Sequence, residues 1–264
     1  MTMRKVTAGR GAAWINESIG SLKNIGMVFW SQALIIGLLG SIPFLGMLQG
    51  VLALFFYGSL ILCLSNSKGQ YNAFSGFQNG NFFRILPILL LNIAASVIVV
   101  ITLWPELKLA IDSSMNGQQL SNEQALAIVL AVFKHMLWMV PLLILLHWVS
   151  SLAIPLATIG EQHGMDAIKQ ATKAVFSNLP AMIVNLICLI LVMAIVSIIC
   201  IIPISIIGAA LASNQTLMQI VLIPFTTVLA AVLLAMMSAN MLFAYRDIFG
   251  ASEENTTNDS EVLI

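Results

Sequence analysis

The stretch LPILLLN occupies positions 86–92, and a second copy of the same pattern, LPAMIVN, occupies positions 179–185. In each copy a Leu-Pro pair is followed by four apolar residues and an asparagine, and each copy opens a long apolar run. A helix needs about 20 apolar residues to cross the hydrocarbon core of a bilayer, which is the length of these runs. The pattern therefore predicts a membrane-spanning segment that is repeated along the chain.

The composition of the whole chain indicates the same environment. Only 8% of the 264 residues are charged and 59% are hydrophobic, whereas a soluble domain carries about 25% charged residues. The formal net charge is zero and no basic cluster is present, so no nucleic-acid partner is expected. Cys63, Cys188 and Cys200 lie inside apolar runs, where they are expected to be small buried side chains and not disulfide partners.

The apolar runs predict an all-α, polytopic membrane bundle with six transmembrane helices in one domain over residues 1–250. The expected spans are residues 26–42, 47–64, 85–104, 137–159, 179–202 and 220–244. Residues 121–136 continue the helical pattern ahead of the fourth span, from a typical helix start at Ser121. The acidic residues 251–264 are expected to form a disordered cytoplasmic tail.

An amphipathic segment precedes each odd-numbered span, at residues 14–24, 65–84 and 161–178. Such segments next to a span usually lie in the membrane interface. A proline, Pro43, Pro105 or Pro203, is expected to break the helix after each odd-numbered span. The predicted unit is therefore an interfacial helix, a span, a proline break and a second span. It is expected three times in parallel orientation, with a degenerate first copy.

The basic residues predict the orientation of these spans. Nine of the eleven Lys and Arg residues fall on the side that holds both termini, and only Lys108 and Lys134 fall on the opposite side. Because the basic side of a membrane protein faces the cytoplasm, both termini are expected to be cytoplasmic.

Three polar side chains at membrane depth are the candidate site residues, namely Asn92, Asn185 and His147. An amide in hydrocarbon either bonds a neighbouring helix or lines a substrate path. His147 is the ionisable side chain placed deepest in a predicted span, so it serves a proton relay or makes a packing hydrogen bond to a carbonyl or to an amide such as Asn185. A substrate path requires all three side chains to face one cavity. Hydrogen bonds in closed helix contacts would indicate packing.

The sequence contains no H-E-x-x-H, P-loop, G-x-G-x-x-G or G-x-S-x-G motif. It has no cluster of Met, His and Cys residues with metal-ligand spacing either. We therefore expect no catalytic residues, no cofactor and no metal site, and ordinary enzymatic chemistry is not expected. A ridge of small residues in the last span, Ala231, Ala235 and Ala239, is typical of close helix packing.

The two ends of the chain carry a resemblance. The opening R-K-V-x-A-G-x-G pattern of residues 4–11 and the closing Y-R-D-I-F-G of residues 245–250 resemble the ends of an uncharacterised family of bacterial six-span inner-membrane proteins. The resemblance implies a multi-pass protein of the bacterial inner membrane. It implies no established activity and supplies no catalytic residue.

Two functions follow as hypotheses. The first is a non-enzymatic integral membrane protein that organises the membrane or acts as an accessory or interaction protein. Its partners would be the lipid bilayer and either another membrane protein or a second copy of the chain. The alternative is a small passive transporter or channel for an apolar or amphipathic solute. The sequence does not identify a small-molecule ligand.

Overall fold

The computed structural model describes residues 3–23, 26–41, 52–65, 72–78, 80–115, 121–210 and 215–250. All regular structure within these ranges is helical, which confirms the prediction of an all-α membrane bundle. The elements are α1 (Gly9–Ser21), α2 (Met27–Ser41), α4 (Ala53–Ser65), the 3₁₀ turn η1 (Ser75–Phe77), α5 (Asn81–Met115), α6 (Asn122–Thr158), α7 (Gly164–Ser177), α8 (Leu179–Ala210) and α9 (Gln215–Phe249).

Four helices in the described part of the chain are long and apolar enough to cross a membrane. These stretches are Asn81–Glu106, Asn122–Thr158, Leu179–Ala209 and Val221–Phe249. The shortest has 26 residues, and at about 1.5 Å per residue it exceeds a hydrocarbon core of about 30 Å. They correspond to the last four predicted spans. Two shorter apolar helices, Met27–Gly40 and Ala53–Ser65, correspond to the first two. The predicted start of the second span, Pro43 and the acidic tail lie outside the described residues.

The expectation of proline breaks is wrong for Pro105 and Pro203, which lie inside helices α5 and α8. A proline in a helix removes one backbone hydrogen bond, whereas ending the helix in an apolar environment leaves several backbone groups without partners. The residues after each proline therefore continue the helix. In contrast, the predicted start of α6 is confirmed, because the Ser121 hydroxyl accepts a hydrogen bond from the Gln124 backbone N–H at 3.2 Å.

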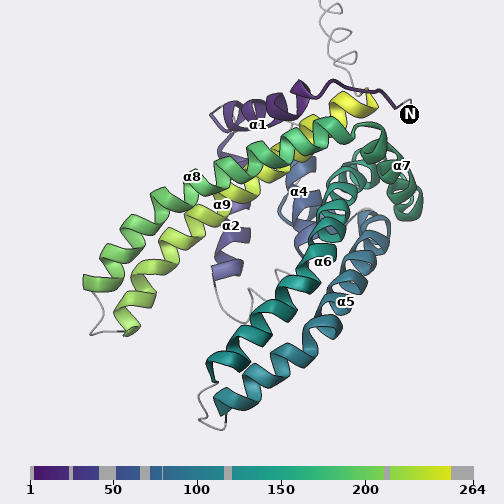
Figure 1. The fold of residues 1–264 in the computed structure, drawn as a ribbon. Coiled ribbons are helices and arrows are strands. Elements are labelled where there is room, and N and C mark those ends of the chain that lie inside the picture. The colour runs from purple at the N-terminus through teal and green to yellow at the C-terminus, as the bar shows by residue number, and fades with distance from the viewer. Residues whose placement is uncertain are drawn as a thin grey trace, which may run out of the picture.

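Figure 1 shows the α5–α6 and α8–α9 pairs diverging from a common end, with α1 and α7 at that end and α4 between the pairs. We call this common end the capped end, and its described residues are 3–23, 72–78, 80–84, 159–180 and 244–250. The main hydrophobic core lies at and just below this end and includes Trp14, Ile85, Leu152, Val175 and Tyr245, all fully buried. The opposite ends of the four long helices make up the distal end.

Helix α2 packs on α9 beside this core. Phe29, Ala33 and Ile36 of α2 are buried in one cluster with Ala231 and Ala235 of α9. The small-residue ridge predicted in the last span is therefore a helix-packing surface, as expected.

The predicted interfacial segments differ in form. Residues 161–178 contain helix α7, and α1 begins at Gly9, earlier than the sequence indicated. Residues 72–78 form only a 3₁₀ turn. The backbone of this turn is held by α4, because the Gly76 N–H donates to the Ser59 hydroxyl at 2.7 Å. The ring of Phe77 stacks on that of Phe55 at 4.7 Å. These contacts with α4 hold the described residues of the segment in a turn.

Each of the three segments places a glycine against the backbone of a neighbouring helix. A Cβ atom added at Gly11 of α1 would overlap the Ala181 carbonyl oxygen of α8. In the same way, Gly164 of α7 meets the Arg84 carbonyl, and Gly76 of η1 meets the Phe55 carbonyl. Because no larger residue fits, the glycines set the distance of the capping segments from the long helices.

The two chain ends are tied to each other at the capped end. The Asp247 carboxylate of α9 accepts hydrogen bonds from Arg10 Nε at 2.5 Å and from Trp14 Nε1 at 2.6 Å. The hydrogen bond that Arg10 donates to Asp247 raises the pKa of the Arg10 guanidinium. The backbone N–H of Arg4 also donates to the Ile248 carbonyl at 2.6 Å. The opening and closing patterns that carried the family resemblance therefore contact each other.

A segment ahead of α1 is held by the α7–α8 junction. The Val6 backbone N–H donates to Asn178 Oδ1 at 2.7 Å, and Asn178 Nδ2 donates to the Arg4 carbonyl at 3.2 Å. Asn178 is fully buried. Its side-chain amide therefore supplies hydrogen-bond partners for the backbone groups of Arg4 and Val6, which lie outside any helix.

The glycine contact yields a matched pair of substitutions in α1. Gly11→Ala should destabilise the folded protein by about 1–3 kcal/mol, because the added methyl group overlaps backbone that cannot rotate away. Gly20→Ala, whose Cβ would meet no atom within 4 Å, should be neutral or stabilising by up to about 1 kcal/mol. Thermal unfolding of both variants in mild detergent measures the difference. Equal stability would contradict the close α1–α8 contact.

Candidate functional site

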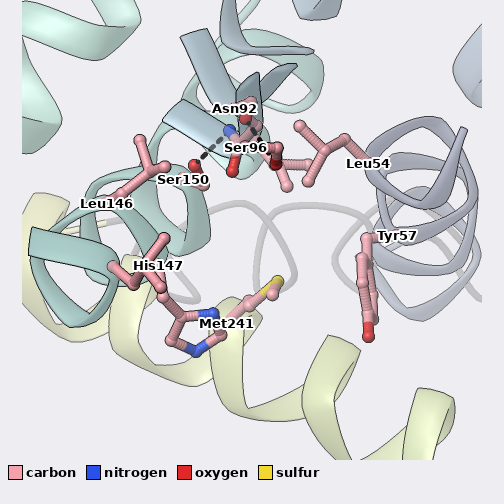
Figure 2. Close-up of a pocket in the computed structure, with 10 residues that line it drawn as sticks. Leu54, Tyr57, Asn92, Ser96, Leu146, His147, Ser150 and Met241 are labelled. Atoms are coloured by element: carbon pink, nitrogen blue, oxygen red, sulfur yellow. Dashed lines mark hydrogen bonds between the residues drawn. The ribbon is translucent and has the colours of Figure 1, made fainter. Parts of the chain in front are cut away.

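A cavity of about 190 Å³ lies between α4, α5, α6 and α9, just below the hydrophobic core of the capped end. Figure 2 shows the side chains around it. Its wall contains both polar and apolar residues: Leu54, Tyr57, Asn92, Ser96, Leu143, Leu146, His147, Ser150, Ile154 and Met241. Two of the three candidate residues, Asn92 and His147, are therefore brought together.

Asn92 joins α5 to α6. Its Nδ2 group donates to the Ser150 hydroxyl and to the Ile88 carbonyl, both at 2.8 Å. These two bonds use both amide hydrogens, as Figure 2 illustrates for Ser150. The Oδ1 atom of Asn92 accepts no hydrogen bond from the described residues. Asn92 thus bonds a neighbouring helix and also faces a cavity.

His147 lies one turn before Ser150 on the same face of α6. Its imidazole is half-buried and lies beside Met241 of α9 in Figure 2. The expected hydrogen bond to a carbonyl or to Asn185 is not found in the described part of the chain. No carboxylate lines this cavity, so the surrounding residues provide no acidic partner for a proton relay at His147.

Asn185 lies outside the cavity, although it occupies the same place as Asn92 in the repeated pattern. It is 7% exposed, and its backbone lies under Gly11 of α1. Its Oδ1 atom is buried and has no hydrogen-bond partner among the described residues. Among the described residues, this cavity is therefore lined by Asn92 and His147 and not by Asn185.

The cavity offers hydrogen bonds and no charge. Its polar groups are the Asn92 amide, the hydroxyls of Tyr57, Ser96 and Ser150, and the His147 imidazole, and none of the lining side chains is Asp, Glu, Lys or Arg. No group of three His, Cys, Asp or Glu residues able to hold a metal ion occurs in the described residues. The arrangement is suited to binding an uncharged group with hydrogen-bonding capacity.

Sequence reasoning missed Ser96 and Ser150. The available signal was spacing, because Ser96 follows Asn92 by four residues and Ser150 follows His147 by three. Such spacings put two polar residues on one helix face. Pairing the two faces required the contact of α5 with α6, which is present in the structure.

Comparisons with known proteins give no match to a protein-family model, to a curated protein or to a solved structure.

The Asn92–Ser150 bond can be tested by a double-mutant cycle. Asn92→Ala, Ser150→Ala and the double variant should show a coupling energy of about 0.6–2 kcal/mol, the range for hydrogen bonds between membrane helices. The control is a second cycle in which Ser151 takes the place of Ser150. The Ser151 hydroxyl donates to the Trp148 carbonyl of its own helix at 2.8 Å. Asn92→Ala and Ser151→Ala should be additive. Unfolding in mixed micelles with increasing SDS measures both cycles, and coupling near zero at Ser150 would refute the bond.

Proposed function

We propose that the protein is a non-enzymatic integral membrane protein that organises the lipid around it. The observation that supports this function is the uneven packing of the long helices. Core residues gather towards the capped end, whereas large apolar side chains further along the same helices, such as Ile101, Leu137 and Ile198, are exposed on the described surface. Lipid chains can cover such apolar surfaces because they adapt to any surface shape, whereas a protein partner would need a complementary surface.

Helix α7 supports an association with the membrane surface. Lys169 and Lys173 are exposed on one side of it, and the apolar side chains of Met165 and Phe176 are also exposed. Basic residues next to apolar ones are typical of a helix that lies among lipid head groups and attracts anionic lipids. The same helix is fixed to α5 through Gly164, so lipid contacts at α7 act directly on the bundle.

The finer topology belongs to this proposal. We place six spans in the bacterial inner membrane as three parallel hairpins, with both termini and the capping segments on the cytoplasmic side. Each of α4, α6 and α9, the returning helices of these hairpins, contacts the other two. The described capping segments lie at one end of the bundle, which supports a parallel arrangement.

The location of the capped end can be tested with introduced cysteines in a variant that lacks Cys63, Cys188 and Cys200. Lys173→Cys lies on α7, and Ser121→Cys lies at the distal end; both positions are exposed. In intact spheroplasts a membrane-impermeant maleimide should modify Ser121→Cys and leave Lys173→Cys unmodified until the membrane is permeabilised. The reverse pattern would overturn the orientation.

The lipid function predicts the phenotype of a strain that lacks the gene. Loss of the protein should change the acyl-chain order of the membrane, measured by a polarity-sensitive membrane dye, together with the lipid profile. Soluble metabolites should remain unchanged, and the wild-type gene should restore membrane order. An unaltered membrane in the deletion strain would contradict the proposal.

A passive path for an apolar or amphipathic solute is the second candidate. It is favoured by the shared cavity of Asn92 and His147 and opposed by the position of Asn185 outside it. In the same deletion experiment, this function predicts the accumulation or loss of a single solute. The wild-type gene would correct that change, and Asn92→Leu would not. That outcome would replace the lipid function.

A further inference from the structure

We propose that the cavity between α4, α5, α6 and α9 binds the head of an uncharged, hydroxyl-bearing lipid whose chain remains in the bilayer. This inference rests on the proposed lipid function and names the class of lipid. Its basis is the position, the size and the unused hydrogen-bonding groups of the cavity.

The cavity lies at membrane depth and opens sideways. At about 1.5 Å per residue, Asn92 lies roughly 16 Å along α5 from its first residue, well inside the apolar stretch. Ser96 and Leu143 are exposed, whereas Ser150 and Met241 at the back of the cavity are buried. The cavity therefore reaches the exposed surface beside Ser96 of α5 and Leu143 of α6, which we place in the membrane, so a lipid can enter without crossing water.

The size of the cavity selects a head group and not a whole molecule. Its volume is about 190 Å³, below the roughly 300–1,000 Å³ of pockets that enclose drug-sized ligands. A hydroxyl with its first few carbons fits such a space. The rest of a long chain must leave through the opening, where the exposed apolar faces of α5 and α6 continue along the membrane.

The hydrogen-bonding groups of the cavity match an alcohol. Asn92 Oδ1 has no donor among the described residues, and the Ser150 hydroxyl accepts from Asn92 without donating to any described group. A hydroxyl donates one hydrogen bond and accepts two. A lipid hydroxyl can therefore donate to Asn92 Oδ1 and accept from Ser150. The His147 imidazole is a further polar group in the cavity wall.

Other membrane components fit less well. A phosphate or carboxylate head would be buried without a basic partner, which carries a large desolvation cost. A pure hydrocarbon would fill the space but leave Asn92 Oδ1 without a donor, at a cost of about 1–3 kcal/mol if water is excluded. The apolar part of the wall, Leu54, Leu146, Ile154 and Met241, is suited to the carbons next to a hydroxyl.

Photolabelling of the full-length protein in vesicles of phosphatidylethanolamine and phosphatidylglycerol tests this site. The probe is a sixteen-carbon alcohol with a diazirine near the hydroxyl end, and its comparators carry a carboxylate or a methyl group in place of the hydroxyl. The alcohol should label peptides that contain residues 92–96 and 143–150, about tenfold more than either comparator. A tenfold preference corresponds to about 1.4 kcal/mol.

Competition identifies the source of the hydroxyl. Diacylglycerol and a long isoprenoid alcohol share this chemistry, and the one that suppresses labelling at the lower concentration is the better ligand. If neither suppresses labelling, the site does not recognise a lipid hydroxyl and the proposal fails.

Variants separate binding from folding. Ser150→Ala should lower labelling by the alcohol about tenfold, while Ser151→Ala and Asn185→Ala, which lie outside the cavity wall, should leave it unchanged. Leu143→Trp at the exposed mouth should block labelling without lowering the temperature of thermal unfolding, so a loss there cannot be ascribed to misfolding. Equal labelling by the methyl comparator, or full labelling of both Ser150→Ala and Leu143→Trp, would overturn the proposal.

The outcome is distinguishable from failure of the proposed function. If the alcohol does not label the cavity while the deletion strain shows altered membrane order that the wild-type gene restores, the assigned ligand is wrong and the lipid function stands. If the cavity is labelled as expected and the deletion strain has an unaltered membrane, the lipid function is wrong and the binding site stands.

Discussion

The Asp247 carboxylate holds the two ends of the chain together, and the organisation of the capped end depends on it. It accepts hydrogen bonds from Arg10 and Trp14 of α1, which fixes that helix across the ends of α8 and α9. Hydrogen bonds to a charged acceptor are stronger than neutral ones. In a bilayer the hydrophobic effect does not drive helices together, because the surrounding lipid is as apolar as the helix surfaces. Polar contacts and close glycine packing must supply the association, and both are concentrated at the capped end.

The uneven distribution of these contacts explains where the cavity lies. Next to the capping segments the helices are drawn together around Trp14 and Tyr245, both fully buried. Further along, α5 and α6 remain paired, while α8 and α9 lead away from them (Figure 1). The cavity lies between the closely packed part and the part where the helix pairs separate. There, side chains of four helices surround one space without filling it. A polar wall is tolerated there because Asn92 and Ser150 satisfy part of each other's hydrogen-bonding capacity.

Much of the fold was predictable from the sequence, since long apolar runs specify helices whatever they contact. The α6 start at Ser121 and the helix α7 follow from local patterns alone. The prolines misled the prediction, because helix-breaking rules describe chains in water and not backbone surrounded by apolar groups. The segment before α5 also differed, since Ser59 and Phe55 of another helix determine its shape. Six spans, the inner membrane and the family resemblance remain predictions.

The two asparagines show most clearly what a repeated pattern leaves undecided. Both follow a Leu-Pro pair at the same spacing, so the sequence predicts equal depth and equal exposure for them. The two asparagines differ in their surroundings because a different helix packs against each of them. Opposite Asn92 stands α6, which offers the Ser150 hydroxyl and leaves a cavity beside it. Across Asn185 lies α1, which at Gly11 closely approaches the Asn185 backbone, and the buried amide oxygen has no partner among the described residues. An unpaired buried oxygen costs about 1–3 kcal/mol, and the close α1–α8 packing offsets that cost. The same residue in the same pattern therefore lies in close helix packing at one position and borders an open cavity at the other.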